Sequence, residues 1–275
     1  MIITDLDGTL FSHARSLSKA NIDTLEELGK RNIVRVVATG RSLYSTKKLI
    51  SDDFPIDYLI FSTGAGIVNW KTKDLLYKNS LNSQIVSQLV DVFIFHKINF
   101  MLHLEIPDNH YFFCYKGDSV PGDYLRRVSL YSDFATPYSS KVVNDIKASQ
   151  FVIILPNIDE YKTIKNITES MNSTLSYIQT TSPLNGESVW LEIFSEGINK
   201  SYAANYLAET LSIPREKTLT VGNDWNDEDL LEWGGASYVM DNAPRKLKKK
   251  YRTLENTQAD GFAKAVKDCL ETDEW

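Results

Sequence analysis

Two carboxylates one residue apart follow a short apolar run at the start of the chain, in the stretch MIITDLDGTL. Ile2 and Ile3 favour a buried strand, whereas Asp5, Asp7 and Gly8 favour a turn, so we expect the strand to end where the carboxylates begin. Side chains of a strand repeat every two residues, so Asp5 and Asp7 would point the same way while the chain is still extended. Their repulsion is relieved when one is protonated or when a cation lies between them, and an all-oxygen site of this kind suits Mg²⁺.

This short stretch has other interpretations. An Asp-Gly pair is also typical of a tight hairpin turn, and D-x-D-G alone does not separate a turn from a reactive site. A calcium loop of the EF-hand type is not expected, because the further acids and the closing Glu are missing. The stretch therefore indicates chemistry only where other polar groups converge on it.

Further polar groups follow other apolar runs, at points where strands are expected to end. They are Thr39 with Gly40 and Arg41, Thr63 with Gly64, and the run from Gly222 to Asp227, with Lys200 at the start of a helix. In an open parallel sheet, ligands bind beyond the carboxyl ends of the strands. The set contains a carboxylate nucleophile, a second acid, metal-binding acids, a hydroxyl donor and a fixed cation. Phosphoryl transfer to a side chain requires such a set.

The helices and strands that would position these groups follow each other in two different patterns along the chain. In the first pattern, strands and helices alternate. Strands are expected at 33–38, 58–61 and 218–221, helices at 17–30 and 43–50, and a basic helix begins at Pro244. Strands separated by helices indicate a parallel sheet with right-handed crossovers. The second pattern is α+β and begins with a hairpin at 65–80 and a helix at 81–96. It continues with strands at 100–105, 111–115 and 150–155 and a helix at 158–171. Two further strands, at 175–180 and 189–194, are expected to pair through a turn at Asn185-Gly186. Residues 116–147 are polar and remain unassigned.

We therefore predict an α/β protein in which an α+β domain is inserted into a parallel-sheet core. The core would comprise residues 1–81 and 188–275, and the insert would comprise residues 82–187. The length of 275 residues agrees with two domains, because one domain has about 100 to 200 residues.

The composition of the chain limits the classes of molecule that it is expected to bind. A net charge of -6 argues against a general surface for nucleic acid or for an anionic membrane. The basic run from Arg245 to Arg252 lacks interleaved aromatic residues, so we interpret it as the solvated face of a late helix. The two cysteines, Cys114 and Cys269, support neither a disulfide framework nor a zinc site. No apolar run reaches the length of a membrane span and no signal peptide is evident, so a cytoplasmic location is expected. The oligomeric state cannot be read from these features.

Taken together, the motifs resemble those of the haloacid dehalogenase-like hydrolases, specifically the Cof-type phosphatases with an α+β cap of class IIB. The resemblance covers both halves of the core in order and, in the cap, only its size, position and α+β style. It rests on D-x-D-G-T from Asp5, A-T-G-R from Ala38, Lys200, G-N-D-W-N-D from Gly222, and M-D-N-A-P from Met240 with Asp260-Gly261 beyond.

The resemblance implies a Rossmann-like core and a two-step phosphatase mechanism for small phosphorylated metabolites, with sugar phosphates as the expected class. Asp5 would be the nucleophile that forms an aspartyl phosphate, and Asp7 the acid and base. Thr39 and the backbone of Gly40 would hold the phosphoryl oxygens, and Lys200 would neutralise charge and position Asp5. Mg²⁺ would be bound by Asp5, the carbonyl of Asp7, Asn223 and Asp227.

The chain departs from the family pattern at three positions. Asn223 stands where Asp is usual, so the metal site lacks one negative charge and its affinity for Mg²⁺ should fall unless Asp224 or Asp227 compensates. Thr63 stands where Asn is common, and Asp241 where Gly is common.

Rival functions separate into three groups. A dinucleotide site at Gly64-x-Gly66 is rejected because the third glycine is absent, and a P-loop at Lys200 is rejected because Asn199 precedes it. A phosphosugar mutase of related fold would use the same aspartyl phosphate but return the phosphoryl group to a sugar. From another functional class, the alternative is a non-catalytic protein that binds phosphorylated ligands. The feature that favours it is Asn223 in place of the usual Asp.

Overall fold

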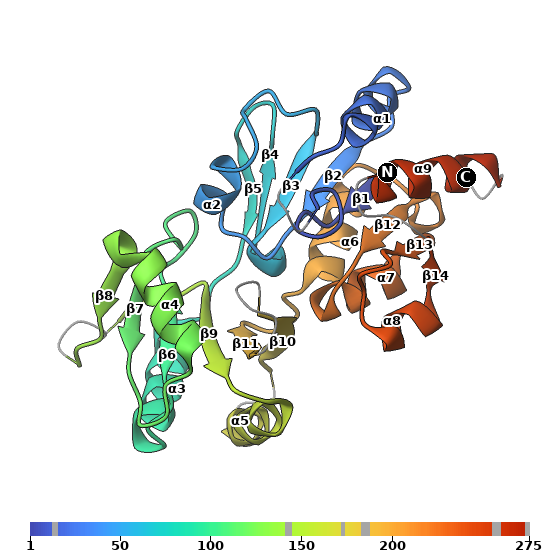
Figure 1. Ribbon diagram of the computed structural model, residues 1–275. Coiled ribbons are helices and arrows are strands. Elements are labelled where there is room, and N and C mark those ends of the chain that lie inside the picture. Colours follow the sequence, from blue (N-terminus) through green and yellow to red (C-terminus); the bar gives the residue numbers. More distant parts are fainter. Residues whose placement is uncertain (13–15, 141–144, 172–173, 183–187, 255–259, 273–275) are drawn as a thin grey trace. The chain divides into compact units, whose positions relative to one another are not determined.

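The computed structural model describes residues 1–275 with the exception of 13–15, 141–144, 172–173, 183–187, 255–259 and 273–275 (Figure 1). The turn expected at Asn185-Gly186 lies outside the described residues. The chain forms two compact units. The first unit comprises Met1–Arg41, Thr46–Lys78 and Asn199–Trp275, and the second comprises Ser42–Ser45 and Asn79–Ile198.

The described residues of the first unit form an eight-stranded sheet in the order β14-β13-β12-β1-β2-β3-β4-β5. Its strands are β1 (Ile2–Thr4), β2 (Arg35–Ala38), β3 (Tyr58–Phe61), β4 (Gly66–Asn69), β5 (Leu75–Lys78), β12 (Leu219–Gly222), β13 (Ala236–Val239) and β14 (Arg252–Thr253). β1 pairs in parallel with β2 and with β12. β3, β4 and β5 pair antiparallel. The predicted parallel core and the predicted hairpin are therefore confirmed.

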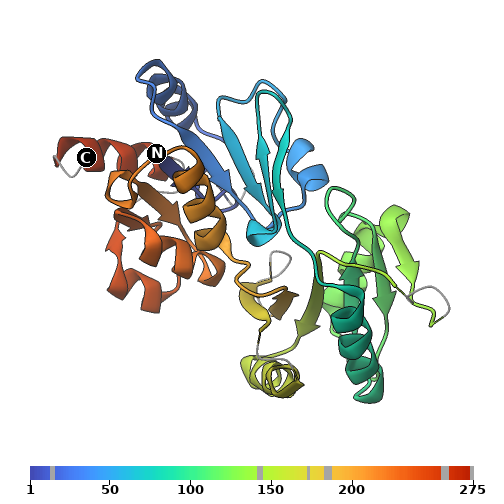
Figure 2. The same cartoon turned by 180° about the vertical axis from the view of Figure 1, so that it is seen from behind.

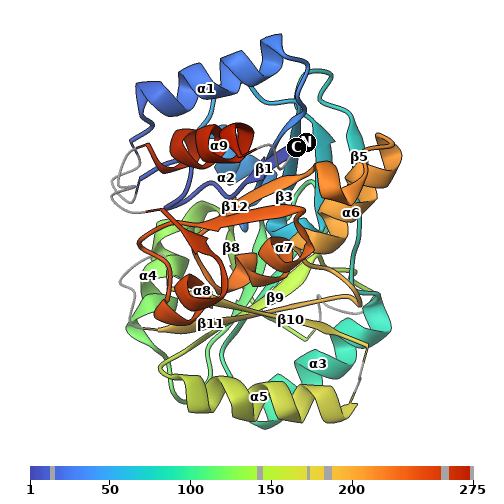
Figure 3. The ribbon, with the colours of Figure 1, turned by 90° about the vertical axis from the view of Figure 1, so that its right-hand side faces the viewer.

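Helices cover both faces of this sheet, as Figure 3 shows. They are α1 (Lys19–Lys30), α6 (Lys200–Thr210), α7 (Glu228–Trp233), α8 (Arg245–Lys250) and α9 (Gly261–Glu271). The short α2 (Leu43–Lys47) is divided between the two units, with its residues up to Ser45 in the second. Short 3₁₀ turns lie at Ser62–Gly64, Arg215–Lys217 and Trp225–Asp227. The small residues Ala203 and Ala204 let α6 lie close to the sheet, where they pack with Ile3, Val36 and Ile60. This close packing fixes the distance of α6 from the sheet, and therefore the position of Lys200.

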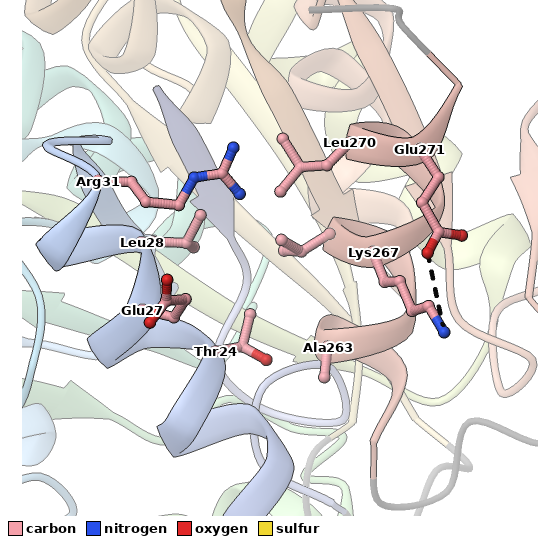
Figure 4. A pocket seen from close by; sticks show the side chains of 9 residues that line it. Thr24, Glu27, Leu28, Arg31, Ala263, Lys267, Leu270 and Glu271 are labelled. Atoms are coloured by element: carbon pink, nitrogen blue, oxygen red, sulfur yellow. Dashed lines mark ion pairs between the residues drawn. The ribbon is translucent and has the colours of Figure 1, made fainter.

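A groove lies between α1 and α9 of the first unit (Figure 4). Its floor is apolar, with Leu28 facing Leu270, and its rim is charged, with Lys267 and Glu271 forming an exposed ion pair one helical turn apart. The residues that line it are Thr24, Glu27, Leu28, Arg31, Ala263, Val266, Lys267, Leu270 and Glu271. None of them is a predicted site residue, so we do not place the chemistry there.

The described residues of the second unit form a six-stranded sheet in the order β10-β11-β9-β6-β7-β8. The strands are β6 (Phe100–His103), β7 (Phe112–Tyr115), β8 (Ala135–Pro137), β9 (Gln150–Leu155), β10 (Ser176–Thr181) and β11 (Val189–Phe194), and the helices are α3 (Ser83–Phe95), α4 (Gly122–Leu130) and α5 (Ile158–Met171), with a 3₁₀ turn at Ser132–Phe134. Alternation along the strands gives the sheet two apolar faces. α3 and α5 pack on the face of Phe100 and Phe151, while Tyr124 of α4 packs on the face of Met101 and Val152. Figure 2 shows α3 in front of this sheet and α4 behind it.

The unit boundaries differ from those expected from the sequence. β11 pairs antiparallel with both β9 and β10, so the second unit extends to Ile198, whereas the sequence analysis placed the return to the core at residue 188. The reason is that β11 is a central strand of the second sheet, and its apolar residues resemble those of a core strand. The unassigned region supplies α4 and β8, and the C-terminal elements β14 and α9 were not predicted from periodicity. Among the described residues, the helices lack the length and hydropathy needed to cross a membrane.

Candidate active site

A buried ion-pair network links the end of β1 to the start of α6 and to the loop after β12. The Nζ of Lys200 donates to Asp5 Oδ1 at 2.7 Å and to Asp227 Oδ1 at 2.6 Å. The side chains of Lys200 and Asp227 are fully buried, and that of Asp5 is 8% exposed. Residues 5, 200 and 227 are distant in sequence, and the parallel pairing of β1 with β12 brings their ends together. Lys200 is therefore a fixed cation shared by two carboxylates.

The position of Lys200 depends on a close approach between two loops. Asn199 caps α6, its side chain accepting the backbone N–H of Tyr202 at 2.7 Å. Gly64 follows β3 with φ +102°, and a Cβ atom on it would lie 2.1 Å from the carbonyl oxygen of Asn199. Only glycine fits such a backbone conformation and such a contact without strain. Gly64 thus holds the N-terminus of α6 against the sheet.

Charge compensation decides the protonation of this network. Burial alone would lower the pKa of Lys200, but the carboxylates of Asp227 and Asp5 raise it, so Lys200 stays an ammonium ion. Burial raises the pKa of Asp5 above its usual range, and the adjacent Lys200 charge opposes that rise. Lys200 therefore supplies the charge that an ionised Asp5 needs in a buried position.

Asp227 closes the loop that follows β12. Its Oδ2 accepts the backbone N–H groups of Asn223 at 2.8 Å and of Asp224 at 3.0 Å, while its Oδ1 faces Lys200. A Cβ atom on Gly222 would lie 2.6 Å from the Cβ of Asp227, so the loop packs tightly only with glycine there. Both oxygens of Asp227 are therefore engaged within the protein.

Three oxygen atoms lie within hydrogen-bond distance of the side-chain amide of Asn223. The amide is satisfied when its nitrogen donates to the carbonyl oxygen of Asp7 at 3.1 Å, to Asp5 Oδ2 at 3.3 Å and to the hydroxyl of Thr9 at 2.9 Å. With the amide turned the other way, Asp5 Oδ2, the Asp7 carbonyl and the Asn223 amide oxygen would offer hard oxygen donors of the kind that Mg²⁺ prefers. The described residues contain no group of three or more His, Cys, Asp or Glu side chains arranged for a metal ion. The donor set at Asn223 fits Mg²⁺ in chemical type while relying on one carboxylate and two neutral oxygens.

Asp7 forms a two-point ion pair with Arg41. Arg41 Nε donates to Asp7 Oδ2, and Nη2 donates to Asp7 Oδ1, both at 2.6 Å. Arg41 belongs to the A-T-G-R motif at the end of β2, but no role was expected for it from the sequence. The available signal was its position at the end of β2, because β2 is the direct neighbour of β1 in the sheet.

Thr39 and Gly40 lie at the end of β2, beside the loop after β3. Thr39 is buried, its Oγ1 accepts the backbone N–H of Arg41 at 3.2 Å, and its carbonyl accepts the N–H of Thr63 at 3.0 Å. These bonds tie the two loops together and leave the hydroxyl hydrogen of Thr39 available for donation. The phosphate-binding role expected for Thr39 and Gly40 stays a prediction.

The comparisons with known proteins agree with the motifs. The family model for haloacid dehalogenase-like hydrolases matches residues 2–266. The chain is similar to the 5-amino-6-(5-phospho-D-ribitylamino)uracil phosphatase YitU of Bacillus subtilis (strain 168), with 22% identity in an alignment that covers 98% of this chain and 96% of that protein.

Solved structures show the same fold. BT1666 from Bacteroides thetaiotaomicron, described among phosphatases of the haloalkanoate enzyme superfamily, matches with a TM-score of 0.78 and 20% identity over 97% of this chain and 93% of that one. BT4131, described as a subclass IIB sugar phosphatase, matches with a TM-score of 0.76 and 17% identity over 97% of each chain. The chain belongs to the haloacid dehalogenase-like hydrolases, and it is an enzyme of their phosphatase type.

Proposed function

We propose that this phosphatase hydrolyses phosphate monoesters of small metabolites, with sugar and polyol phosphates as the substrate class, through an aspartyl phosphate on Asp5. The observation that carries the proposal is the buried contact of Lys200 with Asp5 Oδ1, with Asp7 two residues away. Lys200 holds the Asp5 carboxyl group in place through Oδ1 and compensates its charge.

The proposed reaction has two steps that use the same residues. In the first, Asp5 attacks phosphorus, the bond from phosphorus to the ester oxygen breaks, and Asp7 gives its proton to the departing oxygen. In the second, water attacks phosphorus, Asp7 takes a proton from that water, and the bond to Asp5 breaks to release inorganic phosphate. Lys200, the Thr39 hydroxyl and the Gly40 backbone N–H would stabilise the charge on the phosphoryl oxygens.

We assign the Mg²⁺ site to Asp5 Oδ2, the Asp7 carbonyl and the Asn223 side chain, whose convergence supports it. When bound there, the ion would neutralise charge on Asp5 and on the phosphoryl group. Asp227 would reach the ion only by giving up a bond to Lys200 or to the loop backbone, whereas Asn223 would reach it by turning its side-chain amide.

The second unit is proposed as the domain that selects the substrate. It is an α+β insert that interrupts the chain between β5 and α6 of the core. The relatives provide the substrate class: YitU is named for a phosphorylated ribityl compound, and BT4131 is described as a sugar phosphatase. Both names describe a phosphate ester on a polyhydroxylated carbon chain, so both kinds of compound belong in the first substrate panel.

Turnover of such a panel tests the proposal. Purified protein with Mg²⁺ is expected to release inorganic phosphate from p-nitrophenyl phosphate and from at least one sugar or polyol phosphate, and chelation of Mg²⁺ with EDTA should stop it. Asp5→Asn should abolish release while its far-ultraviolet circular dichroism spectrum stays that of the parent. Retained turnover in Asp5→Asn would contradict the nucleophile.

The same measurements separate the rival functions. An isomerised sugar phosphate without phosphate release would favour the mutase. Saturable binding without any turnover would favour the non-catalytic binding protein.

A further inference from the structure

Arg41 follows β2 and contacts both carboxylate oxygens of Asp7. We propose that Arg41 is the positioning residue of Asp7, and that its guanidinium fixes the Asp7 carboxyl in the orientation from which it protonates the leaving group. The inference rests on the proposed function, because it takes Asp7 as the general acid.

The geometry of the pair is specific. Two separate nitrogens of Arg41 each donate to a different oxygen of Asp7, at 2.6 Å in both cases. A planar guanidinium that contacts both oxygens fixes the position of the carboxyl group and also the orientation of its plane. Asp7 needs such a restraint because its side chain is 45% exposed and follows the end of β1, whereas the Arg41 side chain is only 21% exposed.

Arg41 is itself anchored by its backbone. Its N–H donates to Thr39 Oγ1 at 3.2 Å, and its carbonyl accepts the N–H of Ser62 at 2.8 Å. Arg41 thus ties the loops after β2 and β3 together, and its side chain reaches Asp7 in the loop after β1. An anchored backbone and a two-point contact make Arg41 a rigid support for Asp7.

The arrangement is compatible with proton transfer. When one oxygen of Asp7 carries the proton for the leaving group, the other oxygen still accepts from Arg41, so the side chain keeps its place. Without Arg41 the carboxyl group turns freely toward solvent, and a misplacement of about 1 Å at a reacting group costs about 100-fold in rate. A lysine at this position keeps the charge but holds the carboxyl at a single point.

The leaving group provides the discriminating measurement. p-Nitrophenolate is a stable anion that departs without a proton, whereas an alkoxide must be protonated as it leaves. A residue that acts through the general acid therefore affects alkyl phosphates far more than aryl phosphates. A residue that binds the phosphoryl group affects both alike. kcat/KM is the proper quantity, because it includes only steps up to the loss of the leaving group.

The experiment compares Arg41→Gln, Arg41→Lys and the parent protein with p-nitrophenyl phosphate and with the best sugar or polyol phosphate of the panel. We expect Arg41→Gln to lower kcat/KM for the alkyl ester by about 10- to 100-fold and for the aryl ester by less than about threefold, with the same bias in Arg41→Lys. Arg31→Gln, which removes an exposed arginine at the end of α1, is the matched control and should leave both values unchanged. In an Asp7→Ala background, Arg41→Gln should cost nothing further on the alkyl ester.

Equal losses on the two esters, or no loss on either, would overturn the positioning role while the proposed phosphatase function stands. A further loss from Arg41→Gln in the Asp7→Ala background would also overturn it. Thermal melts of each variant establish folding, and Arg41→Lys, which keeps the ion pair to Asp7 at one point, provides the same comparison where Arg41→Gln fails to fold. A parent protein that releases phosphate from neither ester would overturn the proposed function, and this inference with it.

Discussion

Lys200 and Asp227 lie 2.6 Å apart, and neither side chain is exposed to solvent. The same ammonium group contacts Asp5 at 2.7 Å. Two carboxylates and one cation are thus buried together, and the arrangement is stable only while the cation is present. The Asp5 side chain, the loop after β12 and the start of α6 therefore depend on a single side chain, that of Lys200.

Replacement of Lys200 should reduce both folding stability and turnover. Lys200→Met leaves Asp5 and Asp227 buried without a compensating charge, and removal of one partner from a buried pair costs about 3–5 kcal/mol. Denaturant unfolding monitored by circular dichroism measures this loss. The double variant Lys200→Met/Asp227→Asn removes one of the two stranded carboxylates and should recover part of the stability. Unchanged stability in Lys200→Met would contradict the burial of the pair.

Gly64→Ala should displace the N-terminus of α6. The added Cβ would lie 2.1 Å from the Asn199 carbonyl oxygen, at a backbone φ of +102°, so we expect a loss of about 1–3 kcal/mol and a fall in turnover as Lys200 moves away from Asp5. Gly122→Ala is the matched control, because a Cβ at Gly122 meets nothing within 4 Å in the first turn of α4. Thermal melts and phosphatase assays of the two variants should differ clearly, and similar melting temperatures would contradict the contact.

Asn223→Asp should bind Mg²⁺ more tightly than the parent protein. A carboxylate in place of the neutral amide adds a negative charge to a hard-oxygen site, and we expect the Kd for Mg²⁺ to fall about tenfold. Isothermal titration calorimetry measures the Kd without any need for turnover. Asn226→Asp places the same charge in the same loop and serves as the control, with a smaller effect expected. Equal effects of the two substitutions would place Asn223 outside the contacts to the ion.

The pair of Arg35 and Asp57 should make stability sensitive to acid. Burial alone would raise the pKa of Asp57, but hydrogen bonds from Arg35 and Lys71 lower it to about 2. Since the unfolded value is about 3.9, the pair contributes its full stability above about pH 4 and loses it as the pH falls towards 2. Partial exposure limits the contribution to at most about 2 kcal/mol.

Melting temperatures of the parent protein and of Asp57→Asn, measured between pH 7 and pH 2, test this expectation. The difference between them should be constant above about pH 4 and should shrink below it. Asp133→Asn, at an exposed position, is the control for the loss of one negative charge. A difference that persists unchanged to pH 2 would contradict the lowered pKa of Asp57.

Much of the first unit was predictable because its signals are local. Apolar runs that end before Thr39 and Ser62 mark strands, and apolar spacing with a capping serine marks α1. The boundary at residue 188 was not predictable from such signals. β11 carries apolar residues on both faces, and the sequence alone cannot say whether a strand buried on both faces joins one sheet or the other.

The sequence by itself determined which residues are the candidates for the chemistry: the carboxylates Asp5 and Asp7, the cation Lys200 and the neutral Asn223 in place of an acid. Only the tertiary structure decided how they are paired. Asp227 faces Lys200 with one oxygen and the loop backbone with the other, and Arg41 contacts both carboxylate oxygens of Asp7. The physical reason is that partner choice depends on distances of a few ångströms between side chains far apart in sequence. Those distances are set by the parallel register of β1 with β2 and β12.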